Sequence, residues 1–234
     1  MDKIEVLPCE DGTPGFVRLV DHMGSDLSIV RSARVSYNAD WRGETDENKD
    51  EKLINYLWKN KHTSPFESVS FTFEVKAPIF VLRQWHRHRT WKYNEVSARY
   101  TELDEGYYVP EIEQITTQSE SNKQMRTKEI HPNAHAIRTG IKIMCMASFK
   151  EYKTLIAQGC PRELARSVLP VAAYSRMFAT VDLHNLFHFL ELRMHEHSQY
   201  EIRVYAEKML ELIKPIVPIA CKAYLNSYTN AVSH

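Results

Sequence analysis

The sequence predicts an α+β fold, a helix-rich single domain with a small, mainly antiparallel sheet. Apolar residues recur at the spacing of one helix face over long stretches, whereas few segments alternate as strands do. These segments do not follow the order of a parallel β-α-β sheet, and no G-x-G-x-x-G sequence follows a strand. Only seven glycines occur and no Gly/Ser-rich linker divides the chain, so we expect residues 1–234 to form one domain.

In the first third of the chain, the pattern predicts two helices, a strand and a short helix. Asp26 is a suitable N-cap for a helix over 27–33, and a second helix is expected from about 45 to 60. Residues 69–75, VSFTFEV, alternate between apolar and polar side chains, which is typical of a half-buried strand. Pro78 then fits the first turn of a short helix with the sequence IFVLRQW.

Helical patterns dominate the middle of the chain after a polar segment. Residues 111–130 are rich in Thr, Ser, Gln and Asn, and we expect them to form a surface excursion. A long helix is expected from about 133 to 158, ending at Gly159, because glycine favours the position just after a helix. Pro161 then begins a short helix with the sequence PRELARSVL.

The last third is predicted to contain one strand and two helices. The segment AAYSRMFATV, residues 172–181, is strand-like. Asp182 is a suitable N-cap for the helix LHNLFHFLELR that follows it. Ser198 and Glu201 have the spacing of a capping box, so we expect the last long helix to begin there.

The charge balance argues against a protein that coats nucleic acid, because such proteins are basic overall. Lys plus Arg and Asp plus Glu each number 30, so the formal net charge is zero. The four cysteines lack the spacing of a zinc site or a C-x-x-C motif. They are typical of separate reduced thiols, which favours a cytoplasmic location. The sequence has no signal-peptide pattern and no apolar run of membrane-spanning length, so we expect no membrane partner.

The stretch RHRTWKYNEVSARY, residues 87–100, concentrates hydrogen-bond donors at the end of a largely apolar helix. Further arginines occur among apolar neighbours at Arg166, Arg176 and Arg193, where a guanidinium is costly unless it is paired or bound to a ligand. Arginine binds phosphate through paired, charged hydrogen bonds. The sequence therefore predicts a site for phosphorylated small molecules, above all nucleotides, rather than a solvated basic loop.

Two alternatives compete with this interpretation. The segment RQWHRHRTWKY interleaves basic residues with aromatic rings, and a single-stranded nucleic-acid binder of this kind would show strong salt dependence and no turnover. Histidine pairs suggest a metal, but the H-x-H pairs at 86–88 and 195–197 have Arg or Glu beside them and no cysteine. His184 and His188 share a helix face, which is common on helix surfaces. We expect neither a metal site nor a nucleic-acid partner.

The spacing of Arg87-His88-Arg89, seven further residues and then Ser97 resembles the signature of flavin-dependent thymidylate synthases. More blocks occur in the order of that family: HTSPFE, KAPIFVLRQWHRHR, NEVSARY, PRELARSVLP, and DLHNLFHFLELR followed by HSQYEIR. Together they cover most of residues 16–205. The ordered set is far more specific than the short motif alone, so the fold of that family is expected.

The resemblance implies that the protein makes dTMP from dUMP. Methylenetetrahydrofolate would supply the one-carbon unit, NADPH would reduce FAD, and tetrahydrofolate would be released. No cysteine nucleophile is implied. Cys160, beside Arg162 at a helix start, is the one thiol whose pKa could fall, and we expect it to be structural. The resemblance also implies a homotetramer whose sites lie between subunits, with Glu95 to Arg99 reaching a neighbour's dUMP.

Site residues follow from the resemblance position by position. Arg193 resembles the catalytic residue that favours ionisation of the uracil N3. The residues that resemble the cofactor-binding set are Ser36, His62, Ser64, Glu67, Arg87, His88, Arg89, Glu95, Asp182, Leu183, His184 and His188. The residues that resemble the substrate-binding set are Gln84, Trp85, His86, Arg87, Glu95, Val96, Ser97, Ala98, Arg99, Arg166 and Arg193. The chain departs from the commonest pattern at His86, Ser68, Asp182 and His188.

Overall fold

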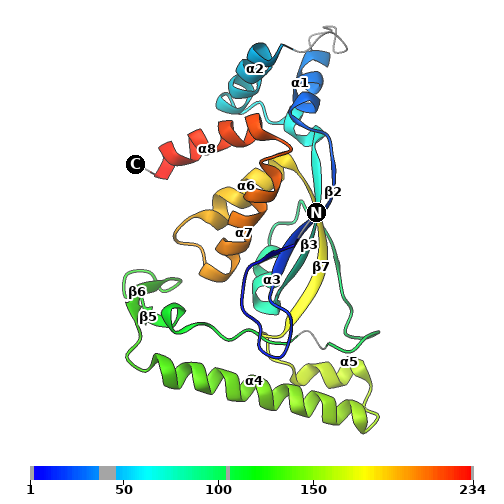
Figure 1. Ribbon diagram of the computed structural model, residues 1–234, viewed down its shortest axis with the longest axis vertical. Helices are drawn as coiled ribbons and strands as arrows, with labels where there is room; N and C mark the ends of the chain where they lie inside the picture. The colour runs from blue at the N-terminus through cyan, green and yellow to red at the C-terminus, as the bar shows by residue number, and fades with distance from the viewer. Residues whose placement is uncertain (1–2, 37–45, 104–105, 233–234) are drawn as a thin grey trace.

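The structure, a computed structural model, describes residues 3–36, 46–103 and 106–232. At its centre lies a five-stranded sheet in which every neighbouring pair of strands is antiparallel (Figure 1). In their order across the sheet, the strands are β1 (Ile4–Glu5), β2 (Phe16–Met23), β3 (Ser70–Pro78), β7 (Tyr174–Asp182) and β4 (Lys92–Glu95). With eight α-helices among the described residues, this sheet confirms the predicted α+β class.

The strands predicted over 69–75 and 172–181 are confirmed as β3 and β7, which pair along all nine residues of each strand. Phe71 and Phe73 of β3 are 0% exposed because their side of the sheet faces the helices. The sequence pattern did not predict β2, although it pairs with β3 over most of its length. A strand is recognised from sequence by alternation, and β2 buries only Phe16, Val17 and Leu19 at its start, whereas its second half is exposed.

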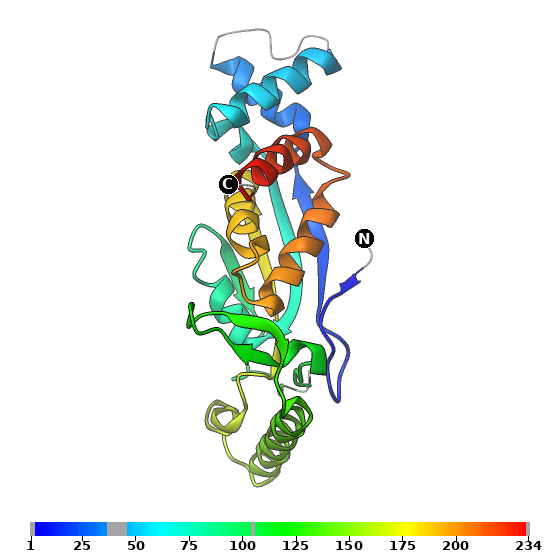
Figure 2. The same cartoon turned by 90° about the vertical axis from the view of Figure 1, so that its left-hand side faces the viewer.

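Two helices cover one face of the sheet, α6 (Leu183–Met194) and α7 (Tyr200–Ile213), as Figures 1 and 2 show. The short helix α3 (Ile79–Trp85) follows β3 directly, as predicted. The ring of Trp85 lies 5.0 Å from that of Phe189 and 6.0 Å from that of Tyr205. All three side chains are 0% exposed, and burial of such large rings is a main source of stability.

At one end of the sheet, three helices pack around a short 3-10 turn, η1 (Ser64–Ser68). They are α1 (Asp26–Val35), α2 (Glu47–Lys59) and α8 (Pro218–Val232). Trp58 of α2 joins them, with its ring 5.4 Å from that of Phe66 and 6.0 Å from that of Tyr224. The helices predicted over 27–33 and 45–60 are therefore present, although Thr45 lies outside the described residues.

The N-cap prediction at Asp26 is wrong, because Ser25 is the N-cap of α1 and its N–H donates to Ser28 Oγ at 3.1 Å. The buried carboxylate of Asp26 instead accepts hydrogen bonds from Ile219 N and Ala220 N, at 2.9 and 3.0 Å. It thereby satisfies free donors at the start of α8. Burial raises the pKa of this carboxyl, and the two N–H donors oppose the rise.

The capping box predicted for Ser198 and Glu201 is also wrong. The N-cap of α7 is Gln199, and no side chain caps that helix. Glu201 is buried and accepts two hydrogen bonds from Arg126 Nη2, at 2.8 and 2.7 Å. The single long helix expected at the C-terminus is interrupted before Pro218, which suits the first turn of a new helix because it has no N–H.

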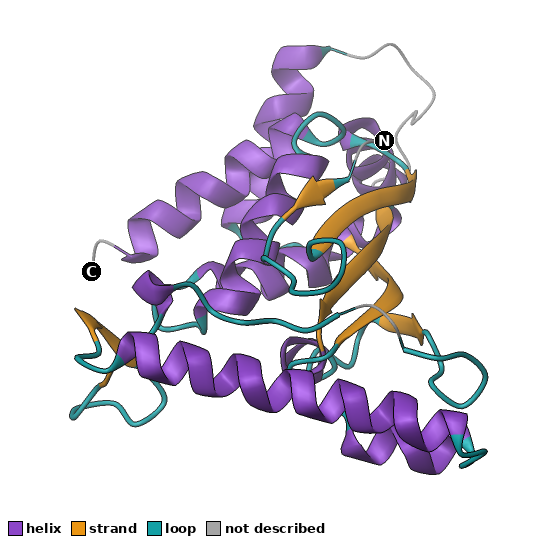
Figure 3. Ribbon diagram, turned by 60° about the horizontal axis from the view of Figure 1, so that its bottom comes forward, coloured by secondary structure: helices purple, strands orange, loops and turns teal. Residues whose placement is uncertain are grey.

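At the other end of the sheet, α4 (Ala134–Ala157) lies across the base of the molecule (Figure 3). It ends two residues before Gly159, whose φ of +82° is in the left-handed region that favours glycine. Beside it lie α5 (Arg162–Ala165) and the 3-10 turn η3 (Arg166–Val168), so the helices predicted over 133–158 and from Pro161 are confirmed.

The polar segment 111–130 lies at the surface, as predicted, but it is regular rather than a plain excursion. It contains a 3-10 turn, η2 (Ile112–Gln114), and a hairpin of β5 (Thr116–Gln118) and β6 (Arg126–Ile130). Such short, polar strands carry little hydrophobic alternation from which they could be predicted. Among the described helices, none is both long and apolar enough to span a bilayer.

Candidate functional site

The segment RHRTWKYNEVSARY forms a tight turn followed by the edge strand β4, rather than a loop alone. The hydroxyl of Tyr93 donates to the carbonyl oxygens of Trp85 and His88, at 2.8 and 2.9 Å, and so closes the turn. Burial raises the pKa of Tyr93, which keeps this hydroxyl protonated. As a result Arg87 and Arg89 are exposed, whereas His88 is only 8% exposed.

The inward side chain of His88 meets Arg193, in the last turn of α6. Arg193 Nε donates to His88 Nε2 at 2.9 Å, and Arg193 Nη2 donates to the backbone oxygen of Gln84 at 3.2 Å. The His88 ring lies 4.8 Å from the ring of Phe189 and 6.4 Å from that of His188.

This environment keeps His88 uncharged. Burial lowers the pKa of His88 to about 4, and the charges of Arg193 and His188 add to that effect. An uncharged imidazole has one ring nitrogen that accepts and one that carries a proton. Because Nε2 accepts from Arg193, the proton of His88 is assigned to Nδ1.

Glu95, at the end of β4, is also held in place. Ser175 Oγ of β7 donates to Glu95 Oε1 at 2.7 Å, and His86 Nε2 lies 3.9 Å from Glu95 Oε2. The ring of His86 packs edge-on against that of Tyr93, 4.8 Å away. Sequence reasoning did not single out Ser175. Its only signal was a polar residue at an inward position of the strand AAYSRMFATV.

The remaining substrate-side residues lie near α5. Arg99 N donates to Ser97 Oγ at 3.4 Å, and Arg99 Nε lies 3.8 Å from Glu163 Oε2 of α5. Ala98 between them is buried, and Arg166 at the start of η3 is exposed. The hydroxyl of Ser97 therefore accepts a backbone hydrogen bond within the turn that it belongs to.

The other expected flavin contacts, apart from Arg87 to Arg89, Glu95 and His188, lie at the opposite end of the sheet. Four of them, around α1 and η1, are exposed: Ser36, His62, Ser64 and Glu67. Asp182 caps α6 as predicted, because its Oδ1 accepts from Asn185 N at 2.9 Å and its Oδ2 accepts from Asn185 Nδ2 at 2.7 Å. The Nδ1 of His184 is buried and makes no hydrogen bond within the described part of the chain. An unpaired buried nitrogen of this kind is a natural partner for a ligand.

Some expected contacts are interior residues. Trp85 and Leu183 are 0% exposed, so their side chains belong to the core. Trp91 is 5% exposed and packs against Trp85. These two indole rings are therefore not available to stack on bases, whereas Tyr93 of the same segment is only half-buried.

One chain does not bring all the expected residues together. The helices α3, which precedes His88, and α6, which carries Arg193, lie between α1 at one end of the molecule and α5 at the other, and η1 packs against α1 (Figure 1). Flavin-side residues around η1 are thus remote from Arg166 in the same chain. Among the described residues, no group of three or more His, Cys, Asp or Glu side chains converges as metal ligands do.

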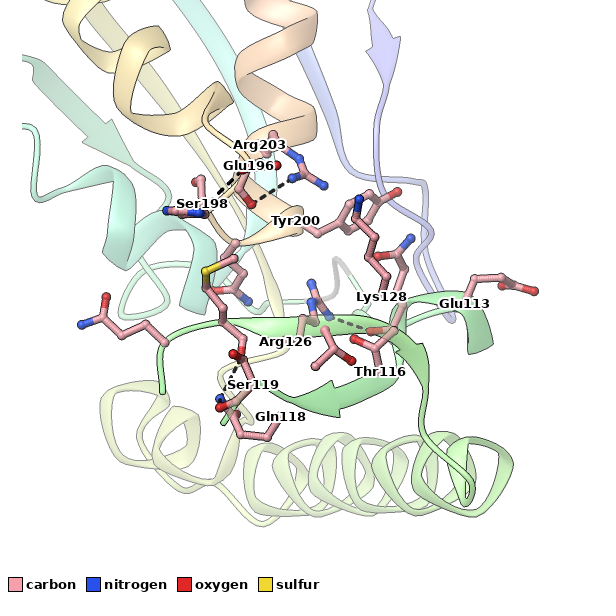
Figure 4. A pocket seen from close by; sticks show the side chains of 16 residues that line it. Glu113, Thr116, Gln118, Ser119, Arg126, Lys128, Glu196, Ser198, Tyr200 and Arg203 are labelled. Carbon is pink, nitrogen blue, oxygen red and sulfur yellow. Dashed lines mark hydrogen bonds and ion pairs between the residues drawn. The ribbon is translucent and has the colours of Figure 1, made fainter. Parts of the chain in front are cut away.

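A cavity of about 690 Å³ lies between the β5–β6 hairpin and the turn that joins α6 to α7 (Figure 4). Its lining comes from residues 113–128 and 196–203. Gln84 Nε2 donates to Gln199 Oε1 of the cavity wall at 2.5 Å, which joins the cavity to the backbone that holds Arg193. Sequence reasoning gave no indication of this cavity.

Comparison with known proteins places the chain in a family. The family described as "Thymidylate synthase complementing protein" matches residues 18–219. A flavin-dependent thymidylate synthase from Treponema denticola is 48% identical over 221 residues, covering 94% of this chain and 82% of that protein. This chain belongs to the flavin-dependent thymidylate synthase family. Another family member, from Wolbachia pipientis wMel, is 47% identical over 212 residues, covering 90% of this chain and 74% of that protein.

Solved structures share the fold. The UMP/dUMP methylase PolB from Streptomyces cacaoi, bound with 5-Br dUMP, aligns with a TM-score of 0.84 and 35% identity over 92% of this chain and 96% of that one. PolB bound with 5-Br UMP aligns with a TM-score of 0.82 and 34% identity over 96% and 97%. The fold expected for the family is therefore confirmed.

Proposed function

We propose that this chain makes dTMP from dUMP as a single catalytic domain. Methylenetetrahydrofolate supplies the one-carbon unit, NADPH supplies reducing equivalents through FAD, and tetrahydrofolate is released. Family membership supports the flavin chemistry, and the nucleotide named for PolB supports the substrate. The observation that carries the proposal is the hydrogen bond from Arg193 to His88, because it fixes a charged group beside Gln84.

The residues expected at FAD suit its chemistry. Arg87 and Arg89 are exposed at the turn and offer charged donors to a pyrophosphate. The buried Nδ1 of His184 would gain a partner from a bound ring system. When bound, FAD supplies the hydride chemistry, and the protein orients its ring and tunes its electronics.

Arg193 would act on the uracil through its charge. A guanidinium beside N3 favours the N3 anion without giving up a proton. The side chain is half-buried, so its attraction to an anion is weakened less than at the surface. His88 and the backbone of Gln84 take two of its N–H donors, which leaves the others for the substrate.

The proposed reaction uses no cysteine or serine nucleophile. Cys160 Sγ donates only weakly, to Pro161 O at 3.8 Å, and Ser97 Oγ accepts from Arg99 N. Neither contact supplies the general base that a nucleophile needs. All four cysteines lie within the described residues and are free thiols, which supports the proposed cytoplasmic location.

We also propose a homotetramer with shared sites. The substrate segment from Glu95 to Arg99 lies far from η1 in its own chain, so a neighbour would complete each site (Figure 1). Apolar side chains on the outer side of α4 are available for contact: Ile143, Met144 and Met146 are 52%, 66% and 52% exposed. Closed symmetric assembly repeats such shared sites in every copy.

Two measurements test the proposal. Equilibrium titration with FAD, followed by flavin fluorescence, should show binding at micromolar FAD. The flavin-loaded protein should then form dTMP from dUMP, methylenetetrahydrofolate and NADPH, and Cys160→Ala should keep this activity. Absence of FAD binding contradicts the whole proposal. Loss of turnover in a folded Cys160→Ala variant would point to a covalent cysteine route instead.

A further inference from the structure

The cavity between the β5–β6 hairpin and the α6–α7 turn, here called the hairpin cavity, is held open by a buried ion pair. Arg126 of β6 donates to both carboxylate oxygens of Glu201, which is only 2% exposed. Arg126 also donates to the backbone oxygen of Gln114 at 2.7 Å. Tyr108 OH adds a third hydrogen bond to Glu201, at 3.1 Å. With all these groups paired, the hairpin is fixed against α7, and the volume of about 690 Å³ is in the range of small-molecule sites.

The walls of the hairpin cavity favour an anion. The helix α7 starts at the cavity without a side-chain cap, so its first N–H groups and the positive end of its dipole face this region. Ser198 Oγ is buried and has no hydrogen-bond partner in the described part of the chain. The ammonium group of Lys128 makes no hydrogen bond or ion pair with the residues that the structure describes. Its side chain extends from the hairpin toward Tyr200 (Figure 4).

The other charged groups of the lining are paired or turned away, and the exposed carboxylate of Glu196 lies 3.7 Å from His197 Nε2. Arg203 Nη1 donates to the backbone oxygen of Glu196, and the charge of Arg126 is matched by Glu201. The side chain of Glu113 points away from the space between the hairpin and the turn (Figure 4). Among the charged side chains that the structure describes in this lining, Lys128 is therefore the cation without a hydrogen-bond or ion-pair partner, and the start of α7 adds uncapped N–H groups.

The hairpin cavity also adjoins the proposed nucleotide site. Gln199 lines the cavity and is hydrogen-bonded to Gln84, whose backbone oxygen holds Arg193. A molecule that reacts near Arg193 could extend past Gln84 and Gln199 into this space. Both co-substrates of the proposed reaction are long molecules with negative groups distant from their reactive rings.

We propose that the hairpin cavity is a subsite for the anionic end of a co-substrate, which it binds by a carboxylate or phosphate group on Lys128 and the start of α7. This inference rests on the proposed function. Two co-substrates carry such an anionic group: the folate has a glutamate tail with carboxylates, and NADPH has a 2′-phosphate. Neither the nucleotide nor the flavin is assigned to this space.

The test measures binding rather than turnover. Flavin-loaded, dUMP-saturated protein is titrated calorimetrically with folic acid, with folic acid carrying three glutamates, with NADP+ and with NAD+. The two oxidised dinucleotides differ by the same 2′-phosphate and cannot reduce the flavin. The variant is Lys128→Ala. The matched control is Lys123→Ala, which makes the same charge change at an exposed residue of the same hairpin outside the cavity lining.

The expected result is a loss of about tenfold in affinity for one co-substrate in Lys128→Ala, as for removal of a charged hydrogen bond. Loss of the preference for the triglutamate over folic acid assigns the folate tail, whereas loss of the preference for NADP+ over NAD+ assigns the 2′-phosphate. The control should stay within about twofold of the unaltered protein, because an exposed lysine outside the cavity contributes little.

Two other outcomes overturn the inference. If Lys128→Ala leaves the affinities for all four molecules unchanged while FAD and dUMP bind normally, the cavity is not a subsite, and the proposed function is unaffected. If Lys128→Ala weakens dUMP itself, the cavity belongs to the nucleotide site. Failure of the unaltered protein to bind FAD and dUMP removes the proposed function and this inference together.

Discussion

Arg193 Nε and His88 Nε2 lie 2.9 Å apart as donor and acceptor, and the acceptor is an uncharged imidazole. A carboxylate in the place of His88 would orient the guanidinium but also cancel its charge. A buried, neutral histidine orients it and leaves the charge intact. The positive charge thus stays available to an anionic ligand beside Gln84.

Replacing Arg193 should separate the chemistry from cofactor binding. Arg193→Ala is expected to lower the rate of dTMP formation by about 100-fold, the usual effect of removing a group that stabilises developing charge. FAD affinity, measured by fluorescence titration, should change little. Arg193→Lys is the matched variant: it keeps a charge but lacks the planar group that reaches both His88 and Gln84. A near-normal rate in Arg193→Ala would show that this role is misassigned.

The neutral state of His88 should appear in the pH dependence of stability. The pKa of His88 is about 4 in the folded chain against an ordinary value of 6.5, so between these values the unfolded chain binds more protons. Stability is therefore fully present above pH 6.5 and is lost as the pH falls toward 4, by at most about 3 kcal/mol. Urea unfolding at several pH values should show a flatter dependence for His88→Gln. The exposed residue His197 provides the control His197→Gln, which should keep the original slope.

Shared sites can be detected by mixing inactive variants. Arg99→Ala damages the substrate segment beside α5, and His88→Ala damages the RHR turn, on the proposed flavin side. If each site takes these halves from different chains, hybrid oligomers should contain some sites with both halves intact and should regain activity. Subunit exchange is followed by native mass spectrometry of differently tagged chains. Absence of recovery in mixtures that have demonstrably exchanged places both halves in one chain.

The ion pair under the hairpin should matter for stability. Arg126→Ala leaves the carboxylate of Glu201 buried without its charged partner, which costs about 3 kcal/mol or more. Adding Glu201→Gln to that variant removes the buried charge and should restore part of the loss. Chemical denaturation of the three variants gives the comparison, with Lys128→Ala of the same strand as a neutral control. If Arg126→Ala is as stable as the unaltered protein, the hairpin does not depend on this pair.

How far the sequence could predict the structure depended on where each residue finds its partner. Asp182 caps the helix that follows it, so local pattern was sufficient and the prediction held. Asp26 had the same local signal, but its partners are Ile219 and Ala220, which no local pattern reveals. The strands of the β5–β6 hairpin are too short and polar to alternate recognisably. The contact of Ser175 with Glu95 could be recognised only from the structure, because it depends on the position of β7 beside Glu95.

The RHR segment, Arg87 to Arg89, also depends on partners that the local sequence does not reveal. Spacing and resemblance located the RHR turn, and the inward direction of its histidine came only from the hydrogen bonds of Tyr93 and the packing of Phe189. Nothing in the order of residues 87–89 distinguishes the buried middle side chain from its exposed neighbours.

The contact of Asp26 with the start of α8 bears on how the protein is produced. The donors to this carboxylate lie 193 and 194 residues further along the chain, so this contact of the first helix forms only when synthesis is nearly complete. The pairing of β3 with β7 has the same constraint, because β7 is synthesised about 100 residues after β3. Domains generally fold as units once their sequence is complete. A chain released before residue 218 would therefore leave Asp26 without these two donors, and one released before residue 174 would also lack β7 and expose an edge of β3. Such truncated chains are expected to be targets for aggregation and proteolysis.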